Sequence, residues 1–239
     1  MPYYKDGKEL PLLDALPHLK DATVPTWFCD FDGVINAMPY ERVWVGAEGR
    51  ISEFDMYDPT NWKVVTHQPD ESKHFGWDNV VEAETGGRTF TLRFSSELVD
   101  NIRALITSGA INFVWLTSWN EDSMRVLNPL LGLPEDTPYL PWYQHRSDYE
   151  HMGKFSALKE LLKEIAPSAR KPFIWTDDVI TKHFAPTDFE GRKNYVEYNF
   201  SQRLKVDSLI IQTNPLFGID RREWALIEDF LGIRGSEKA

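Results

Sequence analysis

The chain has 239 residues, of which 42% are hydrophobic and 26% are charged, so we expect a soluble globular protein with one or at most two domains. Its formal net charge of −11 and its scattered lysines and arginines exclude tight nonspecific tracking along a polyanion, while contact with one strand end stays open. Short apolar runs and a single cysteine, Cys29, exclude a membrane span, a classical signal peptide and an intrachain disulfide, which favours a cytoplasmic protein.

The first apolar run typical of a buried strand, residues 27–29, ends in the segment 30–33, which reads Asp-Phe-Asp-Gly. An insertion with a different pattern, residues 36–95, follows this segment. Near its end, apolar and polar side chains alternate on both sides of Gly86-Gly87, which predicts a β-hairpin over residues 80–94. The earlier part of the insertion, rich in Trp, Tyr, Asp and Pro, predicts no particular element.

Segments with helical periodicity alternate with apolar runs through the rest of the chain. Apolar residues from Leu98 to Ile106 recur at helical spacing, and Gly109 ends that helix. Further strands are expected at 111–116, 173–176 and 209–211, and helices at 120–130, 154–165 and 220–231. This order predicts an α/β fold in one domain, residues 1–239, with a central parallel sheet covered on both faces. Ligands bind at the carboxyl ends of the strands in such sheets.

Asp30 and Asp32 lie two residues apart at the end of the first predicted strand, directly before Gly33. Both side chains would face one crevice if the strand breaks into a turn there. One carboxylate of such a pair can attack phosphorus and form an aspartyl-phosphate, while the other protonates the leaving oxygen and later deprotonates water. The same spacing also occurs in capping turns and in generic metal-binding loops, so the motif alone leaves these alternatives open.

Four motifs follow one another in the chain: a strand ending in Asp-x-Asp-Gly, a strand ending in Thr-Ser, a lysine that opens a helix, and a strand ending in Asp-Asp. They are residues 30–34, 113–118, 153–155 and 173–178. In this order and context the chain resembles the haloacid dehalogenase (HAD) superfamily over residues 24–231. The resemblance implies a HAD-type, Rossmann-like three-layer sandwich with a small β-hairpin flap, residues 36–95, and no large cap domain.

The resemblance implies that Asp30 is the nucleophile and that Asp32 is the general acid/base. Family members that act on carbon–halogen bonds lack a carboxylate at the second position, so Asp32 favours phosphoryl transfer. A Mg²⁺ site is also implied, with Asp30, the backbone carbonyl of Asp32, Asp177 and Asp178 as its ligands, of which Asp177 is the favoured direct ligand. For Asp177 and Asp178, the structural alternative is a pair of acidic residues that cap a turn.

Thr117 and Lys154 are the remaining catalytic candidates that the resemblance implies. Thr117 would hold the phosphoryl oxygens, with Ser118 as a further substrate-binding candidate, although Ser118 and Glu121 also fit a capping box. Lys154 lies in a first helical turn, where the helix dipole disfavours a cation unless an anion is near, and this position favours a phosphate partner. A solvated lysine at a helix start is the alternative.

A site covered only by a flap stays open, which by family logic admits a bulky substrate such as a nucleic-acid end or a protein side chain. Residues 86–93 and 116–119 further resemble a HAD subgroup of bacteria and phages that gene context associates with RNA repair. Arg88 and Arg93 on the flap are therefore candidates for contact with substrate phosphate, although exposed arginines on strands are commonly just solvated.

The leading hypothesis is a magnesium-dependent phosphatase that forms an aspartyl-phosphate and acts on a nucleotide or a nucleic-acid terminal phosphate. A phosphatase for a small metabolite or a phosphoprotein is the second enzyme hypothesis. The alternative of a different class is a non-catalytic HAD-fold binding module, which loss of Asp30, Asp32 or Lys154 would mark, and all three are present. No heptad or apolar surface stripe is seen, so the sequence predicts no oligomeric state.

Overall fold

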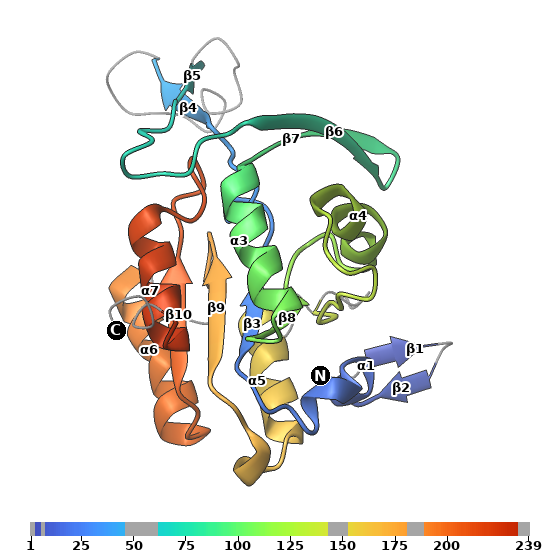
Figure 1. Cartoon of the computed structure of the whole chain (residues 1–239). Coiled ribbons are helices and arrows are strands. Elements are labelled where there is room, and N and C mark those ends of the chain that lie inside the picture. Colours follow the sequence, from blue (N-terminus) through green and yellow to red (C-terminus); the bar gives the residue numbers. More distant parts are fainter. Residues whose placement is uncertain (1–2, 6–7, 46–61, 143–152, 181–188, 234–239) are drawn as a thin grey trace.

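The computed structural model describes residues 3–5, 8–45, 62–142, 153–180 and 189–233 (Figure 1). A parallel four-stranded sheet lies at its centre, in the order β10-β9-β3-β8. The strands are β3 (Thr26–Cys29), β8 (Asn112–Trp115), β9 (Phe173–Asp177) and β10 (Ser208–Gln212). All four lie where the sequence predicts strands, so the α/β fold with a central parallel sheet is confirmed.

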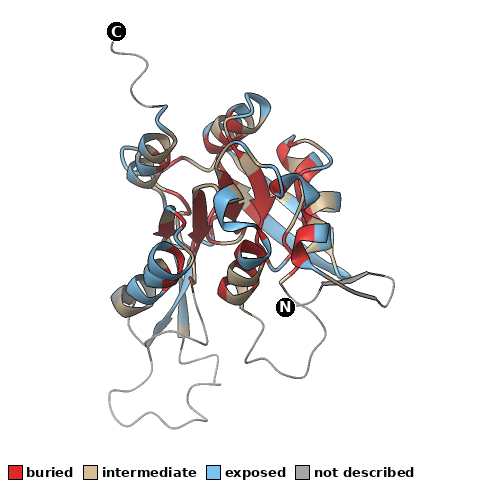
Figure 2. Cartoon of the chain, turned by 90° about the horizontal axis from the view of Figure 1, so that it is seen from below, coloured by how far each residue is buried: buried red, intermediate tan, exposed pale blue. Residues whose placement is uncertain are grey.

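Helices cover both faces of this sheet, and the strand side chains alternate between two apolar clusters. Trp27 and Cys29 belong to one cluster and Phe28 to the other, and all three are buried. The first cluster includes side chains of α3 (Ser96–Thr107), α4 (Asn128–Leu131) and α7 (Arg221–Leu231). The second includes side chains of α1 (Leu12–Ala15), α5 (Lys154–Glu164) and α6 (Phe189–Tyr198). Figure 2 shows the buried strands between these two layers.

Local capping signals fix ends of the helices α3 and α7. Ser95 caps α3 by accepting a hydrogen bond from the backbone N–H of Leu98 at 3.4 Å. Asp220 and Glu223 form a reciprocal capping box at the start of α7, and Gly232 ends that helix in the left-handed conformation. The predicted boundaries of α5 and α7 are confirmed to within one residue.

The predicted helix over residues 120–130 is interrupted. A π-helical segment, Ser123–Leu127, precedes the short helix α4, and the helical turns begin at Glu121. Asn128 is the first residue of α4, and its side chain is buried. It accepts a hydrogen bond from the Trp115 indole at 2.8 Å and donates one to the Thr137 carbonyl at 2.9 Å. These two hydrogen bonds join the start of α4 to β8 and to the segment around Thr137.

The described part of the insertion contains two antiparallel hairpins. The predicted hairpin is confirmed as β6 (Asn79–Thr85) and β7 (Arg88–Phe94), joined by Gly86 and Gly87, which both have positive φ. Residues 38–74, for which the sequence predicts no element, contain a second hairpin of β4 (Tyr40–Trp44) and β5 (Trp62–Thr66). Figure 1 shows both hairpins at the end of the molecule toward which the sheet strands point.

Several short elements were not predicted. They are the hairpin of β1 (Tyr3–Lys5) and β2 (Lys8–Leu10), the helix α1, 3₁₀ turns at Pro17–Leu19 and Pro167–Ala169, the helix α6 and a π-helical segment at Asn199–Arg203. Among the described residues, no helix combines the length and apolar character that crossing a membrane requires.

Candidate active site

The register of the sheet brings the predicted strand-end residues to one edge. Cys29 on β3 is aligned with Trp115 on β8 and with Thr176 on β9. Asp30 and Asp177, each one residue further along, therefore lie at the same carboxyl edge. The backbone N–H of Asp30 continues the ladder by donating to the Thr176 carbonyl at 2.9 Å. The backbone of β3 and β9 thus fixes the spacing between the two carboxylates.

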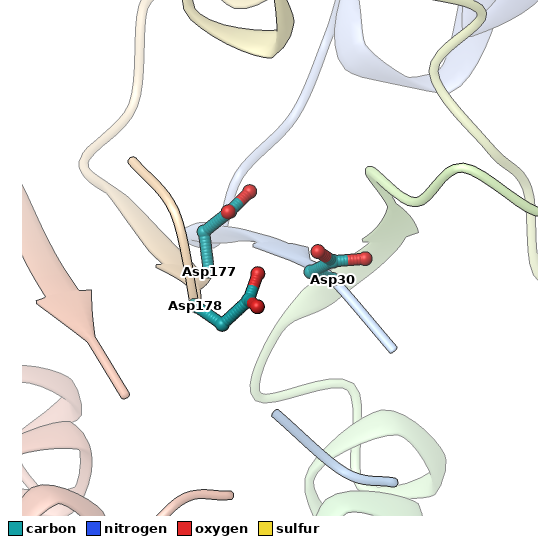
Figure 3. A group of neighbouring side chains, drawn as sticks. All are labelled: Asp30, Asp177 and Asp178. Carbon is teal, nitrogen blue, oxygen red and sulfur yellow. The ribbon is translucent and has the colours of Figure 1, made fainter. Parts of the chain in front are cut away.

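Three aspartates form an acidic cluster at this edge. Asp30, Asp177 and Asp178 each offer a carboxylate oxygen, and these oxygens lie within 4.8 Å of one another. Asp30 and Asp177 are buried, and Asp178 is half-buried. Figure 3 shows the carboxylate of Asp178 pointing toward that of Asp30, with Asp177 beside it. Three hard oxygen donors at this spacing match the ligand chemistry that Mg²⁺ prefers.

Lys154 joins two of these carboxylates from the first turn of α5. Its Nζ donates to Asp30 Oδ2 in a short hydrogen bond and to Asp177 Oδ2 at 2.8 Å. The indole ring of Trp142 lies 5.8 Å from the same Nζ. Burial disfavours the charged amine, but the carboxylates of Asp177 and Asp30 outweigh it and raise the pKa of Lys154. The side chain is therefore a half-buried cation paired with two carboxylates rather than a solvated lysine at a helix start.

Asp177 accepts two further hydrogen bonds from β9 and the turn that follows it. Its Oδ1 accepts a hydrogen bond from the Val179 backbone N–H at 2.8 Å, and its Oδ2 accepts from the Trp175 indole at 3.3 Å. Complete burial raises the pKa of Asp177, and the ammonium of Lys154 opposes that effect. One ammonium shared between two buried carboxylates compensates one of their two negative charges, so the cluster still favours a cation.

Asp32 lies beside this cluster and has different partners. Its Oδ1 accepts a hydrogen bond from Asn36 Nδ2 at 2.7 Å, and its Oδ2 accepts from the Trp119 indole at 2.9 Å. Burial raises the pKa of Asp32, and these two hydrogen bonds offset part of the rise. A carboxyl group that keeps its proton more readily than usual suits a general acid. Its side chain is not in the described acidic cluster, so its predicted metal contact through the backbone carbonyl stays a prediction.

Thr117 and Ser118 follow β8 and differ in their surroundings. Thr117 is buried, its Oγ1 accepts a hydrogen bond from the Trp119 backbone N–H at 3.4 Å, and its carbonyl accepts from the Trp142 indole at 2.8 Å. Ser118 is exposed. The capping box that Ser118 and Glu121 could form is not found among the hydrogen bonds of the described residues, where Thr117 Oγ1 instead supports the turn.

Arg88 and Arg93 lie on β7 of the flap. The guanidinium of Arg93 stacks over the Tyr40 ring, 4.9 Å from its centroid, and donates to the Tyr40 hydroxyl at 2.6 Å. Arg88 is exposed directly after the hairpin turn. In the part of the chain that the structure describes, no ion pair joins either arginine to the acidic cluster, so their contact with substrate stays a prediction.

Asn36, Trp119 and Trp142 were missed as site residues by the sequence analysis. Trp119 follows Thr117 by two residues, and Asn36 follows Asp32 by four, so each lies next to a recognised motif in the sequence. Neither residue type signals a catalytic contact by itself, because buried Trp and Asn side chains commonly serve packing and turn formation. Only the folded arrangement shows that Asn36 and Trp119 donate to the carboxylate of Asp32. It also shows that Trp142 lies beside Lys154 and donates to the Thr117 carbonyl.

Gly33 determines how closely Asp178 approaches the first motif. It has a φ of +72°, and a Cβ at this position would lie 2.6 Å from the Cβ of Asp178 and 3.0 Å from its Oδ2. Gly33 is therefore required both by its left-handed backbone and by the approach of a predicted metal ligand. Its carbonyl accepts a hydrogen bond from Thr213 Oγ1 at 2.6 Å, which ties the turn to the end of β10.

The variant Gly33→Ala is expected to displace Asp178 and to weaken Mg²⁺ binding by about tenfold or more, measured by isothermal titration calorimetry. Gly86→Ala is the matched control because Gly86 has a φ of +56°, and an added Cβ there would meet no atom within 4 Å. Backbone strain should cost each variant about 1–2 kcal/mol of stability, and the clash with Asp178 should add to that loss in Gly33→Ala alone. Unchanged Mg²⁺ affinity in Gly33→Ala would show that Asp178 is not part of the site.

Comparisons of the chain with family models, with curated proteins and with solved structures found no match.

Proposed function

We propose that this protein is a magnesium-dependent phosphohydrolase of the HAD superfamily with Asp30 as its nucleophile. One observation carries the proposal. Asp30, Lys154, Asp177 and Asp178 come from three separate motifs of the sequence, and they meet at the carboxyl edge of the sheet. Asp32, the second carboxylate of the first motif, is held beside them by two hydrogen-bond donors.

The residues present fit a magnesium ion. Asp30, Asp177 and Asp178 supply carboxylate oxygens, and the remaining positions would be left for water and substrate oxygens, as Mg²⁺ requires. A bound Mg²⁺ would neutralise charge on the transferring phosphoryl group and so let anionic Asp30 approach an anionic substrate.

The protein side chains account for both half-reactions. A carboxylate oxygen of Asp30 forms a bond to phosphorus while the ester P–O bond breaks, and the leaving oxygen takes the proton of Asp32. Asp32 then accepts a proton from water as that water's oxygen bonds to phosphorus. The bond between Asp30 and phosphorus breaks, which releases inorganic phosphate and restores the carboxylate.

Lys154 and Thr117 position the reacting groups in this scheme. Lys154 Nζ donates a hydrogen bond to Asp30 Oδ2 and so orients the nucleophile. Its positive charge would then lie close to the oxygens of the phosphoryl group that Asp30 attacks. Thr117 stands at the end of β8, the strand next to β3, and would contribute its hydroxyl to the phosphoryl group. Both roles require a phosphorylated ligand at the carboxyl edge of the sheet.

A nucleotide or a nucleic-acid terminal phosphate is the substrate class we propose. Tyr40 and Phe90, on the two hairpins at this end of the molecule, are 51% and 40% exposed, and aromatic faces of this kind stack on nucleobases. The guanidinium of Arg93 lies on the Tyr40 ring and adds a positive charge for a polyanion. A flap with two exposed aromatic rings and an arginine would bind the base next to the phosphate.

A phosphatase panel with and without Mg²⁺ tests the proposal. It should span mononucleotides, 3′- and 5′-phosphorylated oligonucleotides, sugar phosphates and phosphopeptides. We expect phosphate release that needs Mg²⁺, stops with excess EDTA and is fastest with a nucleotide or an oligonucleotide end. Preference for a sugar phosphate or a phosphopeptide would overturn the substrate class alone, whereas inactivity across the panel would favour the non-catalytic binding module.

A further inference from the structure

We propose that the flap strand β7 positions the general acid/base Asp32 through two residues, Asn36 and Trp119. This inference rests on the proposed function, since it assigns a task to the flap within the same reaction. Each oxygen of the Asp32 carboxylate accepts one hydrogen bond, one from Asn36 and one from Trp119. Both donors in turn contact β7, on its backbone and on a side chain.

The first connection runs through the amide of Asn36. Its Nδ2 donates to Asp32 Oδ1 at 2.7 Å, and its Oδ1 accepts from the backbone N–H of Arg93 at 2.7 Å. A backbone N–H can only donate, so the amide oxygen has to face β7 and the amide nitrogen has to face Asp32. The Arg93 carbonyl also accepts from the Ala37 backbone N–H at 2.8 Å. This part of β7 therefore sets the orientation of the donor to Asp32.

The second connection runs through the indole of Trp119. Its Nε1 donates to Asp32 Oδ2 at 2.9 Å, while the ring packs edge-on against Phe31 with centroids 5.6 Å apart. Phe90 of β7 contacts the same indole ring, also at 5.6 Å. Trp119 is only 8% exposed, whereas Phe90 is 40% exposed. Phe90 thus covers Trp119 on one side and remains accessible to a ligand on the other.

A third contact fixes the tip of the hairpin to the segment that carries Trp119. Thr85 Oγ1, at the end of β6, forms a short hydrogen bond with Asp122 Oδ2. The Asp122 backbone N–H donates to the Trp119 carbonyl at 3.0 Å. The flap is therefore attached both next to Asn36 and next to Trp119. A shift of β7 would change the direction in which the Asp32 carboxylate faces the leaving oxygen.

The orientation of Asp32 matters because proton transfer depends on a heavy-atom distance and angle that hold to a fraction of an ångström. Asn36 and Trp119 are positioning residues in this account, since they act through Asp32. A substrate group that touches the exposed face of Phe90 would press on the same indole ring. Ligand contact on the flap would then be coupled to the geometry of the acid/base.

Trp119→Phe tests the inference because it removes the N–H donor and keeps an aromatic ring. Activity is compared on p-nitrophenyl phosphate, whose leaving group needs no proton, and on an alkyl phosphate, whose leaving group does. We expect kcat/KM to fall about tenfold or more for the alkyl ester and less than about twofold for the aryl ester. With the aryl ester, kcat and KM should fall together, with a burst of nitrophenolate, because hydrolysis of the phosphoenzyme still needs Asp32 as a base.

Two further variants separate positioning from a general loss of packing. Trp115→Phe also removes a buried indole hydrogen bond, from Nε1 to Asn128 Oδ1 at 2.8 Å, but has no contact with Asp32. It should leave the ratio between the two esters unchanged. Phe90→Ala keeps the hydrogen bond and removes the flap contact, and we expect the same pattern as Trp119→Phe with a smaller amplitude.

An equal loss of kcat/KM for both esters in Trp119→Phe, or a wild-type ratio in Trp119→Phe and Phe90→Ala, would overturn the inference. Absence of Mg²⁺-dependent turnover of either ester by the native protein would be a different result. That outcome contradicts the proposed function itself and removes the acid/base role that β7 would support.

Discussion

Replacing Asp30 by asparagine is expected to lower Mg²⁺-dependent phosphate release by about 10⁴-fold or more, because the amide cannot form the aspartyl-phosphate. The fold should persist, since the amide oxygen of the introduced asparagine can still accept the hydrogen bond that the Phe31 backbone N–H donates to Asp30 Oδ1 at 2.7 Å. Steady-state kinetics on the best substrate of the panel, with circular dichroism for folding, measure this effect.

Asp14→Asn is a suitable control for the Asp30 variant. Asp14 is a surface residue whose Oδ1 lies 3.3 Å from Lys20 Nζ, and exposed pairs of this kind contribute at most about 1 kcal/mol to stability. Its replacement should leave turnover unchanged. Substantial Mg²⁺-dependent turnover in Asp30→Asn would show that another residue is the nucleophile.

Replacing Lys154 by methionine is expected to destabilise the metal-free protein by about 3–5 kcal/mol, because Asp30 and Asp177 lose the cation that they share in a buried site. Added Mg²⁺ should restore part of that loss, since a divalent cation supplies the missing positive charge. Urea denaturation with and without Mg²⁺ measures both effects.

The pH at which stability should be measured depends on the pKa of Lys154. The pKa of Lys154 is raised in the folded state, with burial opposing the rise and Asp177 and Asp30 causing it. Its contribution to stability is therefore full below the unfolded pKa of about 10.4 and is lost as the pH rises through the folded pKa. Measurements at about pH 9 report the whole contribution, because the pKa of Asp177 is raised to about 7 and both groups are charged above it.

Lys163→Met controls for loss of a lysine on the same helix. Lys163 is half-exposed, its Nζ lies 2.7 Å from Glu160 Oε1, and its removal should cost at most about 0.5 kcal/mol. Equal stability of Lys154→Met and the native protein, with no effect of Mg²⁺, would contradict the charge balance described for the cluster.

The sheet and its flanking helices were predictable because their signals are local. Each strand is a buried apolar run that ends at a polar residue, and α3, α5 and α7 show helical periodicity with caps such as Ser95 and Asp220. Parallel pairing then forces the strand ends to one edge, so the proximity of Asp30 to Asp177 also followed from the sequence. Lys154 was predictable as the first residue of α5.

The unpredicted elements lack such signals. The helix α6 contains Gly191 and has little amphipathic character, and it is stabilised by burying Val196 on α6 and the nearby Phe200 against the sheet. The strands β4 and β5 pair with each other, although the sequence marks no turn between them. Tertiary contacts decide both regions, so local propensity could not reveal them.

The partners of Asp32 were also beyond sequence reasoning. Asn36 and Trp119 lie near recognised motifs, but their roles depend on where β7 passes over the end of the sheet. The insertion could be recognised as a hairpin without indicating which of its residues face the core. Arg88 and Arg93 were candidates because of their charge and their place on the flap, and the structure shows that Arg93 hydrogen-bonds to Tyr40.

The covalent intermediate is the most direct test of the proposed chemistry. Asp32→Asn should slow hydrolysis of the phosphoenzyme, so a short incubation with Mg²⁺ and p-nitrophenyl phosphate followed by acid quenching should trap it. Peptide mass spectrometry is then expected to find one phosphoryl group on the peptide that contains Asp30, labile to hydroxylamine. A phosphoryl group on any other residue, or native turnover with no phosphoenzyme under these conditions, would contradict Asp30 as the nucleophile.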